Sequence, residues 1–356
     1  MKKFSISIIL FACVLSASAI NFPIEGGERS FIDGDVLNTF RASDKLVVTD
    51  ATTVHALFVA GGGGGGTGVG GGGGGGGVVE IKELTLQPGT YDVIVGVGGA
   101  GAPSSRYTGV NGGDSSITDV DGAAVHERLP ALGGGGGGSW DKRGGASGGS
   151  GGGSAGGAVA GQGIAPQGYA GGNGGGRSAG GGGGAGGAGG IGDPAGDGVA
   201  KEPIAVGGPG VACSITGVEI RYGGGGGGGG GDSGACPGSK GTDGGGDGTP
   251  YNSCLPAGDG VDGLGGGGGG SGWCNVSIPG IKLGGSGGDG VVILRYSYDF
   301  SQIAEPICYI NSADPIVGGG IVDLGVVSLG MNASSLEIFV EAIPENGGDA
   351  ITKSLC

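Results

Sequence analysis

A run of nine consecutive glycines, Gly223–Gly231, limits the structures that this chain can form. Glycine loses more conformational freedom on folding than any other residue, and it has no side chain to bury. A pure glycine run can therefore be ordered only where other parts of the protein pack around its backbone. Further runs begin at Gly61, Gly70, Gly133, Gly180 and Gly265.

The stretch from Gly180 to Gly192 repeats with a period of three, because glycine fills two phases while Ala185, Ala188 and Ile191 share the third. Three residues per turn is the repeat of the polyproline II helix, which in glycine chains is called polyglycine II. Its N–H and C=O groups point outward and need partners on neighbouring chains. Faces without side chains allow that close approach. We therefore expect a bundle of such helices packed side by side.

Strand patterns bracket the glycine-rich region. Residues 54–60 lead directly into Gly61, and GVVILRYSY closes the region near Val291. The segments VVEIKELTL and TYDVIVGV flank the turn sequence Gln87-Pro88-Gly89-Thr90, which predicts a hairpin. No segment shows helical periodicity. We predict a mainly β fold, with a β framework enclosing a bundle of polyglycine-II helices and little or no α-helix.

The first residues have the pattern of a signal peptide: Lys2 and Lys3, an apolar stretch, then small residues up to Ala19. A lipoprotein with a lipidated Cys13 is the alternative. No later apolar run reaches the ~20 residues of a membrane span. We expect an exported chain, extracellular or at the cell surface, that does not span a membrane. The expected parts are a signal peptide (1–19), an N-terminal segment with a strand (20–53), a polyglycine-II domain (54–296) and a disulfide-closed β segment (297–356).

Six cysteines follow the leader, and an even number in an exported chain predicts three disulfides. The sequence leaves 15 connectivities open. The six are Cys213, Cys236, Cys254, Cys274, Cys308 and Cys356.

The net charge of −15 argues against a nucleic-acid partner. A phosphate-binding loop needs Lys and Ser or Thr directly after its last glycine, and residues 238–242 have the wrong order, so no nucleotide is expected. His55 and His126 lack a nucleophile pattern, so we predict no enzyme activity and no catalytic residue. A hydrolase site assembled from distant residues stays the alternative.

No cofactor or metal is predicted, although calcium is an alternative. Residues 284–289 fit the GGxGxD pattern of calcium-binding β-rolls, but no tandem array accompanies it. Asp-Gly is also a common turn dipeptide. Similar contexts surround Asp119, Asp121, Asp243, Asp247, Asp259 and Asp262.

Aromatic residues are few, and their placement is informative. Trp140 and Trp273 each follow a hexaglycine run, whereas Tyr107, Tyr169 and Tyr251 fall in polar joints between runs. Each Trp could cover exposed backbone at the end of a bundle. Alternatively, the five side chains could form a ligand-binding surface on loops held by a rigid scaffold.

The motifs VAGGGGGG, PGTY followed by VGVGGAG, hexaglycine before Trp, and GGDGVVILRY resemble the polyglycine-II glycine-rich domains. Such domains occur in receptor-recognising adhesins at phage tail-fibre tips and in the extracellular part of the anaplastic lymphoma kinase and leukocyte tyrosine kinase receptors. The resemblance covers residues 54–296 and implies a glycine bundle under a β framework, with exposed loops that bind the partner. Kinase activity is not implied, because the V-A-I-K, H-R-D and D-F-G motifs are missing.

The tail from Cys308 to Cys356 resembles the opening strands of fimbrial subunits, which implies an assembly partner through this segment. We therefore predict an exported adhesin that binds a cell-surface protein or glycan. One alternative is a structural or ice-binding protein, for which Ala185 and Ala188 are the available row of small side chains. Another is a ligand-binding ectodomain-like module without kinase activity.

Overall fold

The computed structural model describes residues 22–104, 106–142, 144–175, 178–193, 205–231, 237–274 and 283–299, together with the backbone of four short strands. The chain divides into two compact units, Pro23–Ser297 on the one hand and Met1–Phe22 with Tyr298–Cys356 on the other. In the second unit, β1 (Ser5–Ile6) pairs with β13 (Ile316–Val317) and β14 (Ile338–Ala342) pairs with β15 (Ile351–Leu355). The rest of the predicted signal peptide, together with Cys236, Cys308 and Cys356, lies outside the described residues.

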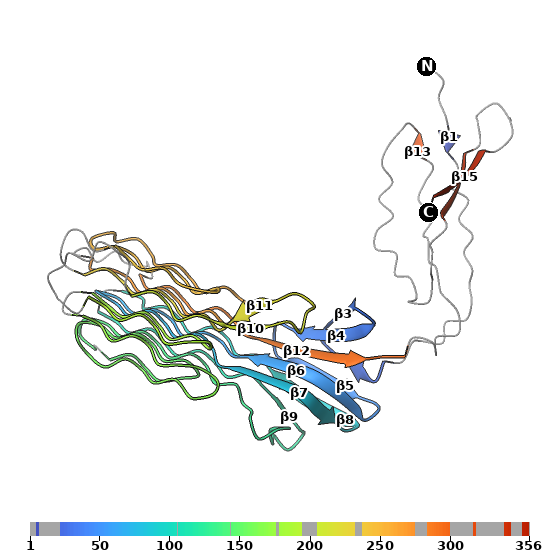
Figure 1. Ribbon diagram of the computed structural model, residues 1–356, viewed down its shortest axis with the longest axis horizontal. Helices are drawn as coiled ribbons and strands as arrows, with labels where there is room; N and C mark the ends of the chain where they lie inside the picture. Colours follow the sequence, from blue (N-terminus) through green and yellow to red (C-terminus); the bar gives the residue numbers. More distant parts are fainter. Residues whose placement is uncertain are drawn as a thin grey trace. The chain divides into compact units, whose positions relative to one another are not determined.

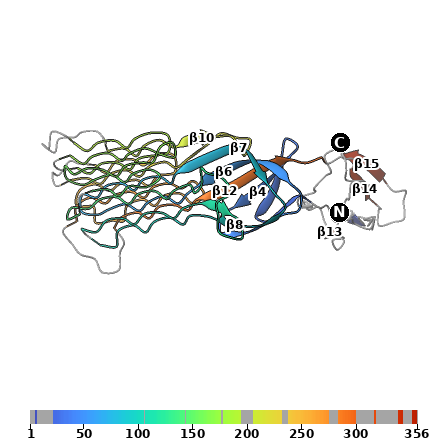
Figure 2. The same ribbon diagram turned by 90° about the horizontal axis from the view of Figure 1, so that it is seen from below.

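The larger unit is built on a five-stranded antiparallel sheet of order β3-β4-β12-β6-β7 (Figures 1 and 2). The strands are β3 (Glu28–Ile32), β4 (Asp35–Phe40), β6 (Thr52–Val59), β7 (Val78–Leu86) and β12 (Val291–Ser297). Strand β12 follows the whole glycine region and still inserts between β4 and β6. The sheet is therefore completed only after the glycine region has folded back on itself.

A second antiparallel sheet has the order β2-β5-β8-β9. Its strands are β2 (Ile24–Glu25), β5 (Asp44–Val48), β8 (Gly89–Ile94) and β9 (Ser116–Thr118). The predicted β7–β8 hairpin is wrong, because the two strands belong to different sheets and the turn at Gln87 connects the two layers. Strands β7 and β8 each have one buried side. Because they lie in separate layers, the buried side of each strand can face the interior between the layers.

The N-terminal segment contains more β structure than the single expected strand. Strands β3 and β4 form a hairpin whose turn residues, Asp33 and Gly34, have φ angles of 48° and 89°. An Asp-Gly pair with positive φ at both positions suits the two-residue turn that joins twisted antiparallel strands.

The side chains of β6 alternate between two buried faces of the five-stranded sheet. On one face, Leu57 and Val59 belong to a cluster with Val291 and Ile293. This face is covered by a hairpin of β10 (Val211–Cys213) and β11 (Ile220–Tyr222), which adds further apolar side chains to the cluster. On the opposite face, Val54, Ala56 and Phe58 are almost fully buried. Buried side chains from the four-stranded sheet include Ile24, Leu46, Val48, Val93 and Ile117.

The glycine region forms a bundle of extended segments that leaves the sheets at one end (Figure 2). In the first run, the partner of each N–H group recurs every third residue. Gly61 and Gly64 donate to residues 110–113, and the other two phases donate to residues 285–288 and 71–74. The carbonyl groups of the same run accept from residues 134–137, 99–102 and 268–271. The run is thus surrounded by six neighbouring segments, and its hydrogen-bond partners recur with a period of three.

Packing of this kind leaves no room for side chains. A Cβ atom added at Gly65 would overlap the carbonyl oxygen of Gly269. Residues 61–77 are all buried. Glycine is required here because the neighbouring backbones approach too closely for a side chain to fit.

The nine-glycine run has the same environment. Gly223–Gly231 are buried, and the N–H groups along the run donate to residues 205–208, 70–73 and 246–249 in rotation. Its carbonyl groups accept from residues on three further segments, including Gly182 and Gly270. The run is therefore a packed element of the structure and not a linker.

The stretch from Gly180 to Gly192, whose sequence repeats with a period of three, is not one continuous segment. The N–H of Gly184 donates to Gly187 O and that of Gly181 donates to Gly190 O, so the chain reverses and forms two antiparallel segments. Ala185 is only 6% exposed, so it cannot join Ala188 in an exposed row. The reversal keeps the backbone N–H and C=O groups inside the bundle. A longer straight segment would extend beyond the neighbouring segments that hydrogen-bond to these groups.

Polar side chains replace missing neighbours where backbone groups lie at an edge of the bundle. Asn111 Oδ1 accepts from the N–H of Gly136 and Asp114 Oδ1 from that of Gly133, at 2.9 and 2.8 Å. Asp259 Oδ1 accepts from the N–H of Ser286, and Asp262 Oδ1 accepts from the N–H of Asp289. Donors and acceptors are thus both three residues apart. Asp119, Asp243 and Asp247 likewise accept from backbone N–H groups. Five of the six Asp residues considered for calcium therefore accept hydrogen bonds from backbone N–H groups.

Candidate binding site at the far end of the bundle

The end of the bundle remote from the sheets is called the far end here. The chain leaves β6 at Val59, reaches the far end at Thr67, and returns to β7 at Val78. Hydrogen bonds of Thr67 connect this first turn to the turns around Tyr107 and Trp140. The far end thus brings together turns from widely separated parts of the sequence.

Trp140 and Trp273 are in direct contact at the far end. Their ring centroids lie 5.6 Å apart and their planes are 79° apart, an edge-to-face arrangement. The Arg106 guanidinium lies over the Trp273 ring, 5.4 Å from the centroid. Arg106 Nη1 is also 3.8 Å from a carboxylate oxygen of Asp141. The cluster therefore combines two half-buried indole rings with a cation and an anion.

Two buried hydroxyl groups position the chain that carries Arg106. Thr67 Oγ1 donates to Ser104 O at 2.5 Å and accepts from the N–H of Tyr107 at 3.0 Å. Ser139 Oγ donates to Arg106 O at 3.1 Å. Thr67 and Ser139 are fully buried, so their hydroxyl groups satisfy backbone groups that water does not reach.

The disulfide Cys254–Cys274 closes a loop beside Trp273. Just before Cys254, the N–H of Asn252 donates to Trp273 O at 2.7 Å, which places the adjoining Tyr251 at the far end. This disulfide agrees with the expected bonding of these two cysteines. Cys213 differs: it is a buried free thiol, so the prediction that it forms a disulfide is wrong.

The five predicted aromatic residues do not all gather in one place. Trp140 and Trp273 touch, Tyr107 lies next to Arg106 and is 58% exposed, and Tyr251 adjoins Trp273. Tyr169 is 51% exposed but lies near the sheets, because Gln167 O, two residues away, accepts from the first N–H of β7. The far end therefore brings together four of the five.

Sequence reasoning did not identify Arg106, Asp141 or Thr67. Arg106 has a φ of 71°, a conformation that is uncommon for residues other than glycine. No periodicity or motif reveals that conformation, although the pair Arg106-Tyr107 between two glycine segments resembles the composition of binding hot spots.

The chemistry of the far end suits recognition. Indole and phenol rings offer large apolar faces with a polar tip, and guanidinium and carboxylate groups form directional hydrogen bonds with sugar hydroxyls or peptide groups. Such a surface can bind a partner through stacking and hydrogen bonds. It presents no nucleophile with an adjacent base among the residues described above.

The profile of a protein family described as a glycine-rich domain matches residues 42–297, which spans β5 through β12 and the whole bundle. No curated protein matches the chain. Among the described residues, no helix has the length and apolar character needed to cross a membrane.

Proposed function

Because the chain belongs to the glycine-rich domain family, we propose that it is an exported adhesin whose far end binds a cell-surface protein or a glycan. The observation that carries this proposal is the convergence of Arg106, Tyr107, Trp140 and Trp273 from three separate turns. Half-buried and exposed aromatic side chains grouped with an Arg side chain are typical of binding surfaces.

The bundle supplies the rigidity that such a surface needs. Gly61–Gly66 and Gly223–Gly231 each have backbone bonds to six neighbours, so the turns at the far end are anchored along their whole supporting segments. A rigid support reduces the entropy lost on binding. We infer that these segments are polyglycine-II helices and that the loops bind the partner, as the resemblance to the tail-fibre adhesins and receptor ectodomains implies.

The C-terminal segment, residues 297–356, has a separate proposed role. Its strands β14 and β15 form an antiparallel pair in a unit distinct from the bundle. We propose that this unit attaches the adhesin to an assembly partner, in line with its resemblance to fimbrial subunits.

Two tyrosines of similar exposure allow a matched test. Tyr107 at the far end is 58% exposed and Tyr169 near the sheets is 51% exposed. The experiment measures binding of the whole chain to a glycan array and to intact cells, and then compares Y107A with Y169A. We expect Y107A to weaken binding at least about tenfold, the equivalent of ~1.4 kcal/mol, and Y169A to leave it unchanged.

The opposite result, in which Y169A weakens binding and Y107A does not, would move the site away from the far end. Absence of binding to every glycan and cell type would contradict the adhesin proposal itself. Circular dichroism of both variants distinguishes loss of a contact from loss of the fold.

A further inference from the structure

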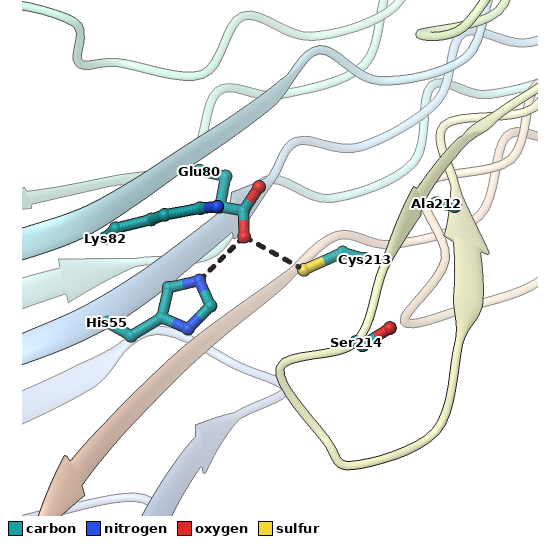
Figure 3. A pocket seen from close by; sticks show the side chains of 6 residues that line it. All are labelled: His55, Glu80, Lys82, Ala212, Cys213 and Ser214. Atoms are coloured by element: carbon teal, nitrogen blue, oxygen red, sulfur yellow. Dashed lines mark hydrogen bonds and ion pairs between the residues drawn. The ribbon is translucent and has the colours of Figure 1, made fainter.

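A pocket of ≈ 520 Å³ lies at the sheet end of the molecule, where the β10–β11 hairpin meets β6 and β7. Its lining includes three side chains that are common metal ligands, and Figure 3 shows their polar atoms pointing toward one another. The lining residues are His55, Glu80, Lys82, Ala212, Cys213 and Ser214. None of them takes part in the far-end cluster.

The three potential ligand atoms lie close together. His55 Nε2 is 2.7 Å from Glu80 Oε1, and Cys213 Sγ is 3.7 Å from the same oxygen. All three atoms lie within 4.8 Å of one another. In Figure 3 the Glu80 carboxylate lies between the imidazole ring and the sulfur.

The strands hold these side chains in place. His55 and Glu80 come from β6 and β7, which pair with each other, and Cys213 comes from β10, which pairs with β11. The pairing of β6 with β7 is irregular between Val54 and Ala56, at the position of His55. Bulges of this kind redirect side chains and are frequent beside functional sites.

We propose that His55, Glu80 and Cys213 form a binding site for a zinc ion, with the open pocket providing the fourth coordination position. Imidazole, carboxylate and thiolate are the ligands that zinc prefers, and three protein ligands with one open position describe its reactive sites. Bond lengths of about 2.0 to 2.3 Å in a tetrahedron separate ligand atoms by roughly 3.3 to 3.6 Å. The distance from Glu80 to Cys213 is already close to this spacing, and the other two ligand distances need only small side-chain movements.

The surroundings of the sulfur fit this role. Cys213 is 6% exposed, so few exogenous thiols or oxidants can reach it except through the pocket. Burial raises the pKa of the Cys213 thiol, and the Glu80 carboxylate raises it further, whereas the N–H of Ile215 hydrogen-bonds to the sulfur and lowers it. The Cys213 thiol donates to Glu80 Oε1 at 3.7 Å. A bound cation would take the place of that proton.

Cobalt(II) is the probe for the experiment, because it replaces zinc and its bond to a thiolate produces a near-ultraviolet absorption band. The full chain is titrated with Co²⁺ without reductant, so that the Cys254–Cys274 disulfide stays intact. We expect the band to saturate at one ion per chain and to disappear in C213S. We expect H55Q to weaken cobalt affinity at least about tenfold, while H126Q, which alters the other histidine of the chain, changes nothing.

Two results would overturn the proposal: a folded chain that gives no thiolate band, or a band of equal intensity in C213S. If C213S does not fold, H55Q and E80Q decide the question, because both variants retain the Cys213 thiol. The two altered side chains are 28% and 36% exposed. Cobalt affinity unchanged in both variants would mean that the His55–Glu80 pair is a structural ion pair only. The outcome is independent of far-end binding, which Y107A tests separately.

Discussion

Trp140 and Trp273, each preceded in sequence by a hexaglycine run, meet edge to face at the far end of the bundle with ring centroids 5.6 Å apart. The contact joins two turns that the sequence separates widely. The Arg106 guanidinium lies over the Trp273 ring of this pair.

The Trp pair should contribute coupling energy to stability. A double-mutant cycle with W140A, W273A and the double variant, measured by urea unfolding, should give an interaction of about 0.5 to 1.5 kcal/mol. Additive effects of the two substitutions would show that the rings are neighbours without mutual stabilisation.

Replacement of a glycine inside the bundle should be far more damaging than replacement at its surface. A Cβ atom at Gly227 would overlap the carbonyl oxygen of Ser239, whereas one at Gly144 meets only Val159 O at 3.6 Å. We expect G227A to lower the free energy of unfolding by more than about 4 kcal/mol or to prevent folding. G144A should stay within about 1 kcal/mol of the parent, and equal effects of both substitutions would contradict the packing described for the nine-glycine run.

The edge carboxylates should act as hydrogen-bond acceptors and not as calcium ligands. Asp114 accepts from the N–H of Gly133, so D114A should cost about 1 to 3 kcal/mol by leaving that group without its partner. D114N keeps an acceptor oxygen and should restore most of the stability. Thermal unfolding with and without a calcium chelator checks the other explanation: a large chelator-induced fall in the unfolding temperature would favour calcium.

The ion pair between Asp35 and Arg295 should make stability depend on pH. Although burial raises the pKa of Asp35, hydrogen bonds from Arg295 and Ser297 and the charge of Arg295 outweigh it and hold that pKa below its ordinary value of 3.8. The stabilisation is therefore fully present above pH ~4 and is lost as the pH falls through the lowered pKa of the folded state.

The variant D35N tests this dependence. At neutral pH it should be less stable than the parent, and the difference should shrink as the pH falls below about 4. Urea unfolding across this range measures the difference. A gap between parent and variant that is constant with pH would show that the Asp35 charge does not contribute.

Much of the architecture could be predicted from local patterns. The alternation in residues 54–59 and 291–297 identified β6 and β12, and the closeness of both to glycine runs indicated a bundle bracketed by strands. The β7–β8 hairpin failed as a prediction because a turn sequence specifies a reversal but not which strands pair. The period of three in residues 180–192 likewise did not reveal the chain reversal there, since glycine permits both an extended segment and a turn.

The candidate site was predictable only in part. Position after a glycine run singled out Trp140 and Trp273, yet nothing in the sequence brings Arg106 to the Trp273 ring. Likewise, Cys213 looked like a disulfide partner, because a count of cysteines cannot distinguish a buried thiol beside His55 and Glu80 from one near another sulfur.

The sequence by itself determined that long stretches of backbone must be covered by other backbone, because a glycine run has no side chains to bury and every N–H and C=O group needs a partner. It also showed a period of three in residues 180–192. Only the tertiary structure decided which six segments surround each run and which side chains meet at either end. Because hydrogen bonds between glycine backbones are alike at every position, they do not select which segments pack together. That selection depends on the sheets, the turns and the few side chains that fix where each segment begins.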